Sequence, residues 1–250
     1  MLSDRDLERY SRQLMLADFS IDAQERLAAA TVLVVGVGGL GCPLALYLAG
    51  AGVGRLILAD GDTVERSNLA RQLLYGEDDI GRPKAQVAAE RLGERFPDVT
   101  VQAHVAHLAE PALADLLAGV DLVADGSDNY PIRFALNRAC IAAGLPLVSA
   151  AAVRGEGQLA SFSVHRGTPC YRCVYPDTSP ATALSCRDSG VLGPVVGTLG
   201  TLQALEVIKV LSGWGEPLLG RLLYLDLAAP AQRIVTLTRR SDCPDCAGRG

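Results

Sequence analysis

Apolar and polar residues along this chain fall into blocks that predict strands followed by helices. The clearest block is Thr31–Val35, a β-branched run that breaks into the glycines of Gly36–Gly41 and resumes as an apolar segment at Pro43. Valine-rich runs favour a buried parallel strand, glycines permit a tight turn, and proline suits the first turn of a helix. The pattern therefore predicts a strand, a glycine turn and a helix.

The alternation of strand-like and helix-like segments continues through the first 150 residues. The strand-like runs are 55–60, 99–105, 121–129 and 145–150. Between them, helical spacing is clearest at 83–96 and 133–143, and the first thirty residues favour two short helices. Strands that alternate with helices predict an α/β fold, Rossmann-like, with a doubly wound and mostly parallel sheet.

The period of the pattern changes after Gly157. Antiparallel strands are indicated by alternation at 158–164, 221–227 and 233–238. Residues 200–211 predict a core helix that ends at Gly213. The segment 177–191 is rich in Ser, Thr, Pro and Ala, and we expect it to be a long mobile loop of the kind that is functional more often than filler.

Composition narrows the classes of function. The 250 residues are 49% hydrophobic and 20% charged with a net charge of -5, which fits one large α/β domain and provides no basic surface for nucleic acid. Residues 27–54 carry no charge, but their glycines and proline favour a buried strand and helix over a membrane span. The N-terminus is charged and lacks an apolar signal segment, so we expect a cytoplasmic protein.

The glycine turn at Gly36–Gly41 has the pattern Gly-x-Gly-x-x-Gly. Free N–H groups and the positive end of the helix dipole bind phosphate at such a turn, and the absence of side chains allows the phosphate to approach. Asp60, about twenty residues further on, suits a ribose hydroxyl of a dinucleotide. From these residues alone, three roles of the glycine turn remain open. It could bind an NAD-like cofactor, it could bind another nucleotide, or its glycines could only permit close packing of the helix on the strand.

Polar residues follow the ends of several predicted strands. Asp60 and Asp62 begin a polar loop, and Asp128 ends the fourth strand. Open α/β sheets bind ligands beyond the carboxyl ends of their strands, where a carboxylate that faces a phosphate can hold Mg²⁺. Lys84 stands at a predicted helix start, where the dipole disfavours a cation. It is therefore a candidate for anion contact, the alternative being an ordinary surface lysine.

Two C-x-x-C pairs indicate a metal site. Cys170 and Cys173 form one pair, and Cys243 and Cys246 form the other about seventy residues later. Four thiolates complete a closed tetrahedral Zn²⁺ site, which would be structural because no coordination position stays open. The alternative is a thioredoxin-like redox site, which needs only one pair.

The other cysteines and two histidines carry weaker signals. Cys186 lies in the predicted mobile loop and is a candidate reactive thiol, whereas Cys42 and Cys140 fall on predicted helices and are expected to pack. His104 and His107 have no evident metal-ligating residues near them in the sequence, so we expect both to be non-catalytic.

Taken together, the motifs resemble the ThiF/MoeB/HesA family, bacterial relatives of ubiquitin-activating enzymes. The resemblance covers nearly the whole chain and rests on Gly36–Gly41, Asp60-x-Asp62, Ser67–Gln72, Gly81–Lys84, Ser127–Asn129 and the paired C-x-x-C. It implies that ATP, not NAD, fills the site. It also implies adenylation of the C-terminal glycine of a ubiquitin-like sulfur-carrier protein ending in Gly-Gly, for thiamine or molybdopterin synthesis.

The resemblance implies roles for individual residues. Arg71 and Lys84 match positions that neutralise the phosphates of ATP. Asp128 matches the magnesium ligand, and Asp60 matches the ribose contact. Arg12 matches an arginine that reaches the ATP of a neighbouring subunit, which implies a homodimer. The other matched nucleotide contacts are Gly39, Ser67, Asn68, Leu69, Ala70 and Asn129.

Three further expectations follow from the resemblance. Cys186 matches a cysteine that links covalently to the carrier during sulfur transfer, and its surroundings look more like the thiamine-pathway member. Ala70 stands where the family usually has glutamine or asparagine, but Arg71 is retained beside it, so we expect little change in chemistry. Because no rhodanese-like extension follows Gly250, we expect a separate sulfurtransferase.

The expected organisation is a single adenylyltransferase domain. It comprises a helical N-terminal arm at 1–30, a nucleotide-binding half at 31–155, and a half at 156–250 that binds the carrier and zinc. Two other function classes share part of the pattern. An NAD-dependent oxidoreductase would use the same glycine loop but leaves Arg71, Lys84 and the cysteine pairs unexplained, and a non-catalytic zinc-stapled binding scaffold would use only the cysteines.

Overall fold

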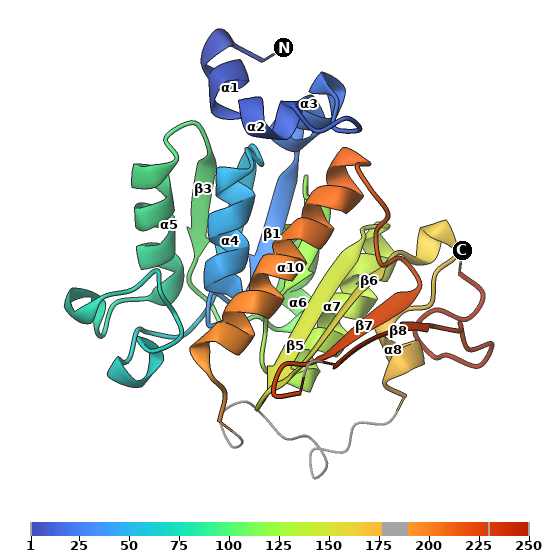
Figure 1. Cartoon of the computed structure of the whole chain (residues 1–250). Helices are drawn as coiled ribbons and strands as arrows, with labels where there is room; N and C mark the ends of the chain where they lie inside the picture. The colour runs from blue at the N-terminus through green and yellow to red at the C-terminus, as the bar shows by residue number, and fades with distance from the viewer. Residues whose placement is uncertain (1, 177–189, 230, 250) are drawn as a thin grey trace.

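Strands and helices alternate in the computed structural model of the chain, which describes residues 2–176, 190–229 and 231–249 (Figure 1). Eight strands of this part form one sheet in the order β3-β2-β1-β4-β5-β6-β7-β8. They are β1 Thr31–Val35, β2 Arg55–Ala59, β3 Thr100–His104, β4 Leu122–Asp125, β5 Leu147–Val153, β6 Glu156–Phe162, β7 Arg221–Asp226 and β8 Ala231–Thr236. β1 to β5 run parallel, and β6, β7 and β8 each run antiparallel to the strand before them. The predicted α/β fold with an antiparallel C-terminal part is confirmed.

The chain reverses its direction of travel across the sheet between β1 and β4. From β1 it proceeds to β2 and β3 on one side, and then returns to β4 and β5 on the other. Val34 pairs with Leu58 of β2 and with Ala124 of β4, so the carboxyl ends of these three strands lie side by side. Ligands of open α/β sheets bind outside such a reversal point.

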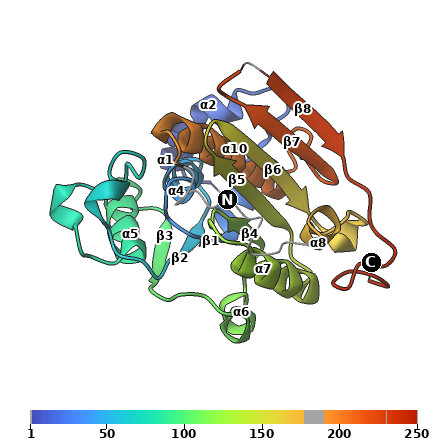
Figure 2. The same cartoon turned by 90° about the horizontal axis from the view of Figure 1, so that it is seen from below.

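Helices cover both faces of the sheet (Figure 2). The helices are α1 Asp4–Arg9, α2 Ser11–Leu14, α3 Ile21–Ala29, α4 Gly41–Gly50, α5 Lys84–Arg95, α6 Glu110–Leu116, α7 Tyr130–Ala143, α8 Tyr171–Val174 and α10 Gly193–Ser212, with short 3-10 turns η1 Arg66–Asn68, η2 Glu77–Asp79 and η3 Val164–Arg166. Apolar side chains of α4, α5 and α10 pack on one face, and those of α6 and α7 pack on the other.

β1 lies at the centre of this arrangement and is buried on both faces. Val32 and Val34 belong to the cluster under α4 and α10, whereas Leu33 and Val35 belong to the cluster under α6 and α7. Because successive side chains of a strand point to opposite faces, a strand covered on both sides must be apolar throughout. This is why the sequence shows an uninterrupted apolar run here instead of alternation.

α10 is the predicted core helix, but it is longer than expected. It begins at Gly193, not at residue 200, because Pro194 is compatible with a helix's first turn, and it ends where Gly213 adopts a φ of 74°. By length and composition α10 could cross a membrane. It instead packs against α4, β5 and β6, with Gln203 and Glu206 buried in the fold.

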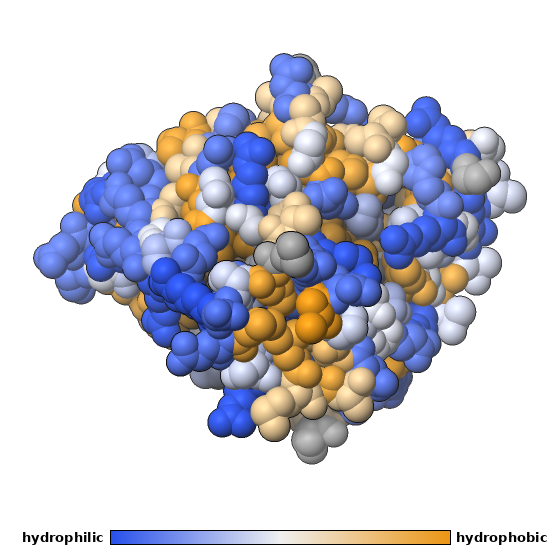
Figure 3. All heavy atoms as spheres, turned by 90° about the horizontal axis from the view of Figure 1, so that it is seen from above, coloured by the Kyte–Doolittle hydropathy of each residue, from blue (hydrophilic) through white to orange (hydrophobic). Residues whose placement is uncertain are grey.

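The N-terminal arm contains three helices, not the predicted two. Tyr10, with φ of -96° and ψ of 11°, separates α1 from α2, and its ring is buried at only 5% exposure. The arm lies at the amino ends of the strands (Figure 1). Met15 and Ile21 leave apolar side chains exposed on the arm, and the view from above shows apolar patches among charged ones on this face (Figure 3).

Candidate functional site

A cavity of about 1530 Å³ lies at the carboxyl ends of β1, β2 and β4. Its walls are the glycine turn, the loop that follows β2, the segment after β3, and the loop between β4 and α7. Both polar and apolar side chains line it, as is usual for small-molecule sites. The lining residues include Gly36, Gly39, Asp60, Asp62, Ser67, Asn68, Arg71, Lys84, Asp128, Asn129, Arg133 and Arg172.

The glycine turn forms one wall of the cavity through its backbone. Gly36 has a φ of 81°, in the left-handed region that favours glycine. A Cβ on Gly41 would lie only 1.9 Å from the carbonyl oxygen of Gly36, so the turn and the start of α4 are in direct backbone contact. At the start of α4, Pro43 has no N–H, and the N–H groups of Cys42 and Leu44 donate to the carbonyls of Gly38 and Leu40. The backbone that lines the cavity is therefore that of the turn itself, at Gly38 and Gly39.

Replacing Gly41 with alanine should therefore open the turn. We expect the variant to lose about 1–3 kcal/mol of unfolding free energy through overpacking, together with most of its nucleotide affinity. Calorimetric unfolding and ATP titration measure the two effects. Gly93→Ala is the matched control, because Gly93 lies on α5 where an added Cβ would meet no atom of a neighbouring element within 4 Å, and it should gain about 0.5–1 kcal/mol. Unchanged stability and ATP affinity in Gly41→Ala would contradict this account of the turn.

Asp60 ties the glycine turn to the end of β2. Its carboxylate accepts hydrogen bonds from the N–H of Val37 and the N–H of Asp62, each at 2.8 Å. Burial raises the pKa of Asp60, and the two N–H donors oppose that shift. The carboxylate is thus held between the glycine turn and the following loop, and its contact with a ribose stays a prediction.

Lys84 projects into the cavity wall from the first position of α5. Its side chain is only 7% exposed, and its Nζ lies 3.1 Å from the Asp62 carboxylate. The backbone N–H of Lys84 also donates to the carbonyl of Asp62 at 2.9 Å. The surface-lysine alternative is therefore wrong, because the ammonium is a buried cation at the edge of the site.

The loop that contains η1 brings further polar groups to the same wall. Ser67, Asn68 and Arg71 line the cavity. Arg71 is positioned by a 2.9 Å hydrogen bond from its Nη1 to the carbonyl of Ser67. Leu69 and Ala70 lie between them in the chain but are not among the residues that line the cavity.

The loop after β4 lies directly beside the glycine turn, since a Cβ on Gly36 would lie 3.1 Å from the carbonyl oxygen of Gly126. Asp125 is fully buried and accepts hydrogen bonds from the hydroxyls of Ser127 and Ser149, at 2.6 and 2.7 Å. Asp128 and Asn129 follow at the cavity surface. Asn129 caps α7 by accepting from the N–H of Ile132 at 3.2 Å, which is why α7 begins at Tyr130 and not at the predicted residue 133.

One predicted site residue lies elsewhere, and one cannot be placed because it falls outside the described part of the chain. Arg12 is on α2, at the amino ends of the strands, and it does not line the cavity. Cys186 lies outside the described residues. Of the other cysteines, Cys42 and Cys140 are buried, as predicted, and burial raises the pKa of Cys42 to about 12, so its thiol stays protonated at neutral pH.

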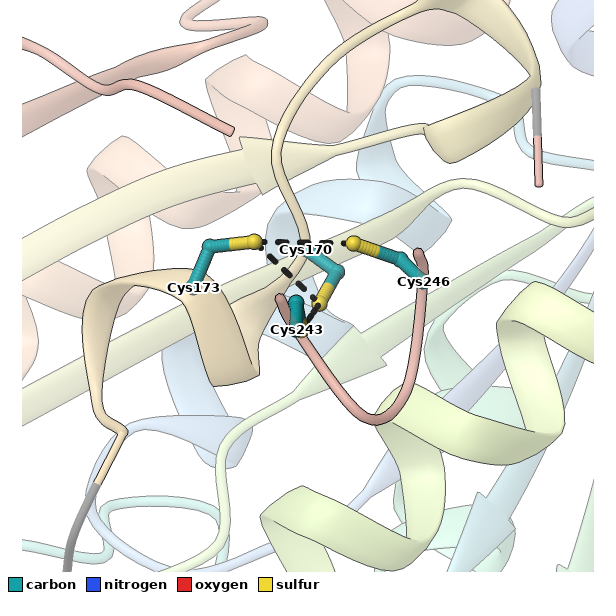
Figure 4. Close-up of side chains that lie close together, drawn as sticks. All are labelled: Cys170, Cys173, Cys243 and Cys246. Atoms are coloured by element: carbon teal, nitrogen blue, oxygen red, sulfur yellow. Dashed lines mark hydrogen bonds between the residues drawn. The ribbon is translucent and has the colours of Figure 1, made fainter. Parts of the chain in front are cut away.

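The four cysteines of the C-x-x-C pairs meet in one buried cluster (Figure 4). Cys170 and Cys173 belong to the turn that starts α8, and Cys243 and Cys246 come from the C-terminal segment. Sulfur atoms of Cys170 and Cys243 are 3.6 Å apart, and those of Cys173 and Cys246 are 3.5 Å apart. All four are free thiols whose sulfur atoms lie within 4.8 Å of one another.

This sulfur cluster has the dimensions of a tetrahedral metal site. A Zn–S bond of about 2.3 Å places the sulfurs of a tetrahedron about 3.8 Å apart. The two contacts across the pairs and the 3.9 Å contact between Cys170 and Cys173 are close to that value. The four sulfurs therefore fit a four-coordinate thiophilic metal. The cysteine cluster also joins the C-terminal segment to the segment at the start of α8.

Sequence reasoning missed several side chains of the cavity. Arg133 lies one turn into α7 behind Asp128 and is only 8% exposed, and Arg138 follows on the same helix. Their position on a helix that starts at the site was the available signal. Arg172 lies inside the first C-x-x-C pair, whose spacing predicts a metal site and gives no sign of a cavity residue. His107, expected to be non-catalytic, also lines the cavity.

Comparison with known proteins matches the chain to one family and to several curated relatives. The sequence pattern of the ThiF family matches residues 10–245. Mouse "Adenylyltransferase and sulfurtransferase MOCS3" is 52% identical over 247 residues, which cover 98% of this chain and 54% of that protein. The chain thus spans about half the length of that relative.

Two bacterial relatives match over nearly their full length. The Escherichia coli "Sulfur carrier protein ThiS adenylyltransferase" is 47% identical, with 99% of this chain and 98% of that protein covered. The Escherichia coli "Molybdopterin-synthase adenylyltransferase" is 44% identical, with 98% of each chain covered. Among solved structures, Escherichia coli MccB with ATP superposes with a TM-score of 0.80 and 26% identity, covering 96% of this chain and 73% of that one.

Proposed function

Because the chain belongs to the ThiF family, we propose that it adenylates the C-terminal glycine carboxylate of a ubiquitin-like sulfur-carrier protein ending in Gly-Gly. The names of its relatives support this activity, since they are adenylyltransferases of sulfur-carrier or molybdopterin pathways. A structural neighbour solved with ATP supports ATP as the nucleotide.

The observation that carries the proposal is the charge arrangement in the cavity. The glycine turn, Arg71 and Lys84 provide hydrogen-bond donors and cations at the cavity, and Asp128 adds a carboxylate to the same cavity. A dinucleotide oxidoreductase uses the glycine turn and Asp60 but does not by itself explain two cations placed beside them. A triphosphate needs all of these groups, because its negative charge grows on the leaving pyrophosphate.

The reaction requires positioning more than a covalent protein nucleophile. An oxygen of the carrier's terminal carboxylate forms a bond to the α-phosphorus. The bond from that phosphorus to the oxygen bridging to the β-phosphate breaks, and pyrophosphate leaves with the electron pair. Arg71 and Lys84 would stabilise the charge on the departing phosphates, Asp60 would hold the ribose, and Gly39 would let the phosphates approach the backbone.

Two metals belong to this proposal. Asp128, an exposed carboxylate on the cavity wall, would hold Mg²⁺, which supplies further charge neutralisation for the triphosphate when it is bound. The four clustered cysteines would hold Zn²⁺, which closes the C-terminal segment onto the sheet and leaves no position for substrate.

The active unit is proposed to be a homodimer. Arg12 lies on an arm at the opposite end of the strands from its own cavity, so it would serve the site of a second subunit. Exposed apolar side chains on the arm, among them Met15 and Ile21, support burial of this region against another chain. The carrier's pathway, a covalent role of Cys186, a separate sulfurtransferase and a cytoplasmic location stay predictions.

Carrier-dependent exchange of pyrophosphate into ATP tests the proposed function. We expect exchange only when a carrier with an intact Gly-Gly terminus is present, and none when its last glycine is deleted. Parallel assays with a ThiS-like and a MoaD-like carrier separate the thiamine from the molybdopterin alternative. Absence of exchange with every such carrier, together with tight binding of NAD(H) and not ATP, would favour the oxidoreductase instead.

A further inference from the structure

The two C-x-x-C pairs also bring together two charged residues that lie between their cysteines. Arg172 lies between Cys170 and Cys173, and Asp245 lies between Cys243 and Cys246. The Arg172 Nε is 3.7 Å from the Asp245 carboxylate. The same cluster that gathers the sulfurs therefore brings these two opposite charges together.

α7 fixes both charged residues. Asn137, only 1% exposed, donates from Nδ2 to the Asp245 carboxylate at 2.8 Å and accepts from the N–H of Tyr171 at 2.9 Å. The Arg172 guanidinium lies over the Phe134 ring at 4.2 Å from its centroid. The aromatic face and the carboxylate hold the guanidinium plane in one orientation.

Arg172 lines the same cavity as the proposed nucleotide-binding residues, and its guanidinium is less fully paired than the cations of Lys84 and Arg138. Lys84 pairs with Asp62 at 3.1 Å, and Arg138 pairs with Glu110 through two bonds of 2.6 Å. Arg172 has only the 3.7 Å contact to Asp245 and one 3.3 Å bond from Nη1 to the carbonyl of Pro176. Among the described residues its Nη2 donates to no acceptor, so within that part of the chain the Arg172 guanidinium has N–H groups left for a ligand.

The position of Arg172 indicates which part of the substrates it faces. Asp60 and the glycine turn direct a nucleotide towards β1 and β2, on one side of the reversal point. Arg172 and Phe134 lie on the other side, beside α7 and the strands that follow β4. A second substrate that must reach the phosphates from outside the nucleotide has this side of the cavity available.

We propose that Arg172 is a binding residue for the C-terminal tail of the protein substrate, an inference that rests on the proposed function. A tail ending in Gly-Gly offers no side chains, so it can be recognised only through its backbone carbonyls and its terminal carboxylate. An arginine fork presents several N–H donors in a plane and matches such oxygens. Asp245, Asn137 and Phe134 act as positioning residues for this fork.

Steady-state exchange assays of Arg172→Ala test the inference. We expect the KM for the carrier to rise roughly tenfold or more through loss of a charge-assisted hydrogen bond, with kcat within about threefold and the KM for ATP unchanged. Asp245→Asn should raise the carrier KM several-fold, because it releases the guanidinium without removing a cysteine. Arg166→Ala is the matched control, since Arg166 is exposed on η3 and outside the cavity, and it should leave all three constants unchanged.

The zinc content of each variant separates tail binding from a merely structural role. Wild-type metal content with a raised carrier KM supports the inference. Should Arg172→Ala lose metal, Arg172→Gln keeps a chain that still lies over Phe134, and its carrier KM should rise at least fivefold. An unchanged carrier KM in Arg172→Gln overturns the inference, while exchange by the wild type leaves the proposed function standing.

Discussion

Asp128→Ala is expected to lower the rate of carrier-dependent ATP–pyrophosphate exchange by a factor of roughly 10²–10³. Asp128 lies on the cavity wall, in the loop that β4 and the cap of α7 hold in place. Removal of its carboxylate would leave the charge of the triphosphate less neutralised during bond transfer. Exchange at saturating ATP and carrier measures the effect as a loss in kcat.

The control for this variant must remove an aspartate without touching the site. Asp115→Ala serves, because Asp115 is exposed on α6 and outside the cavity, and it should retain full exchange activity. Asp128→Asn preserves the shape of the side chain but not its charge, so it should be nearly as slow as the alanine variant. Normal exchange by both Asp128 variants would contradict a role in adenylation and favour a non-catalytic scaffold.

The site residues of the nucleotide half were predictable because parallel strands place their carboxyl ends at one edge of a sheet. Asp60 follows β2 and Asp128 follows β4, and each flanks the glycine turn that follows β1. The parallel arrangement of the strands is enough to predict that these residues lie close together. The sequence does not predict the burial of Lys84, because Lys84 is placed by a loop in which Thr63 and Pro83 pair as an isolated β-bridge.

Other features depend on tertiary contacts that leave no periodic signal. The start of α10 at Gly193 is compatible with the sequence, but the backbone of Ala70 passes so near that a Cβ on Gly193 would lie 2.6 Å from its carbonyl oxygen. Such a contact joins segments more than a hundred residues apart. Arg172 was missed for the same reason, because its place at the cavity depends on Asp245 and Asn137, which only the fold brings near.

The cysteine cluster leads to the second large expected effect. Cys243→Ser should abolish zinc binding, from one ion per chain in the wild type, and lower the unfolding free energy by on the order of 4 kcal/mol or more. Between residues 241 and 249, Cys243 and Cys246 are the buried residues, and the other buried side chain is the charged Asp245. This segment therefore has almost no apolar core of its own, so we expect it to need metal coordination to stay folded against Ile141 and Val164.

Elemental analysis and calorimetry measure the two effects of Cys243→Ser, with a fall in Tm of roughly 8–16 °C for a chain of this size. Cys140→Ala is the matched control, because Cys140 is also a buried free cysteine but packs in the core under α7. It should retain one zinc and lose only about 1 kcal/mol. If the wild type contains no zinc and a chelator leaves its Tm unchanged, the four thiols are packing residues. In that case, the orientation of Arg172 would depend on Asp245, Asn137 and Phe134 alone.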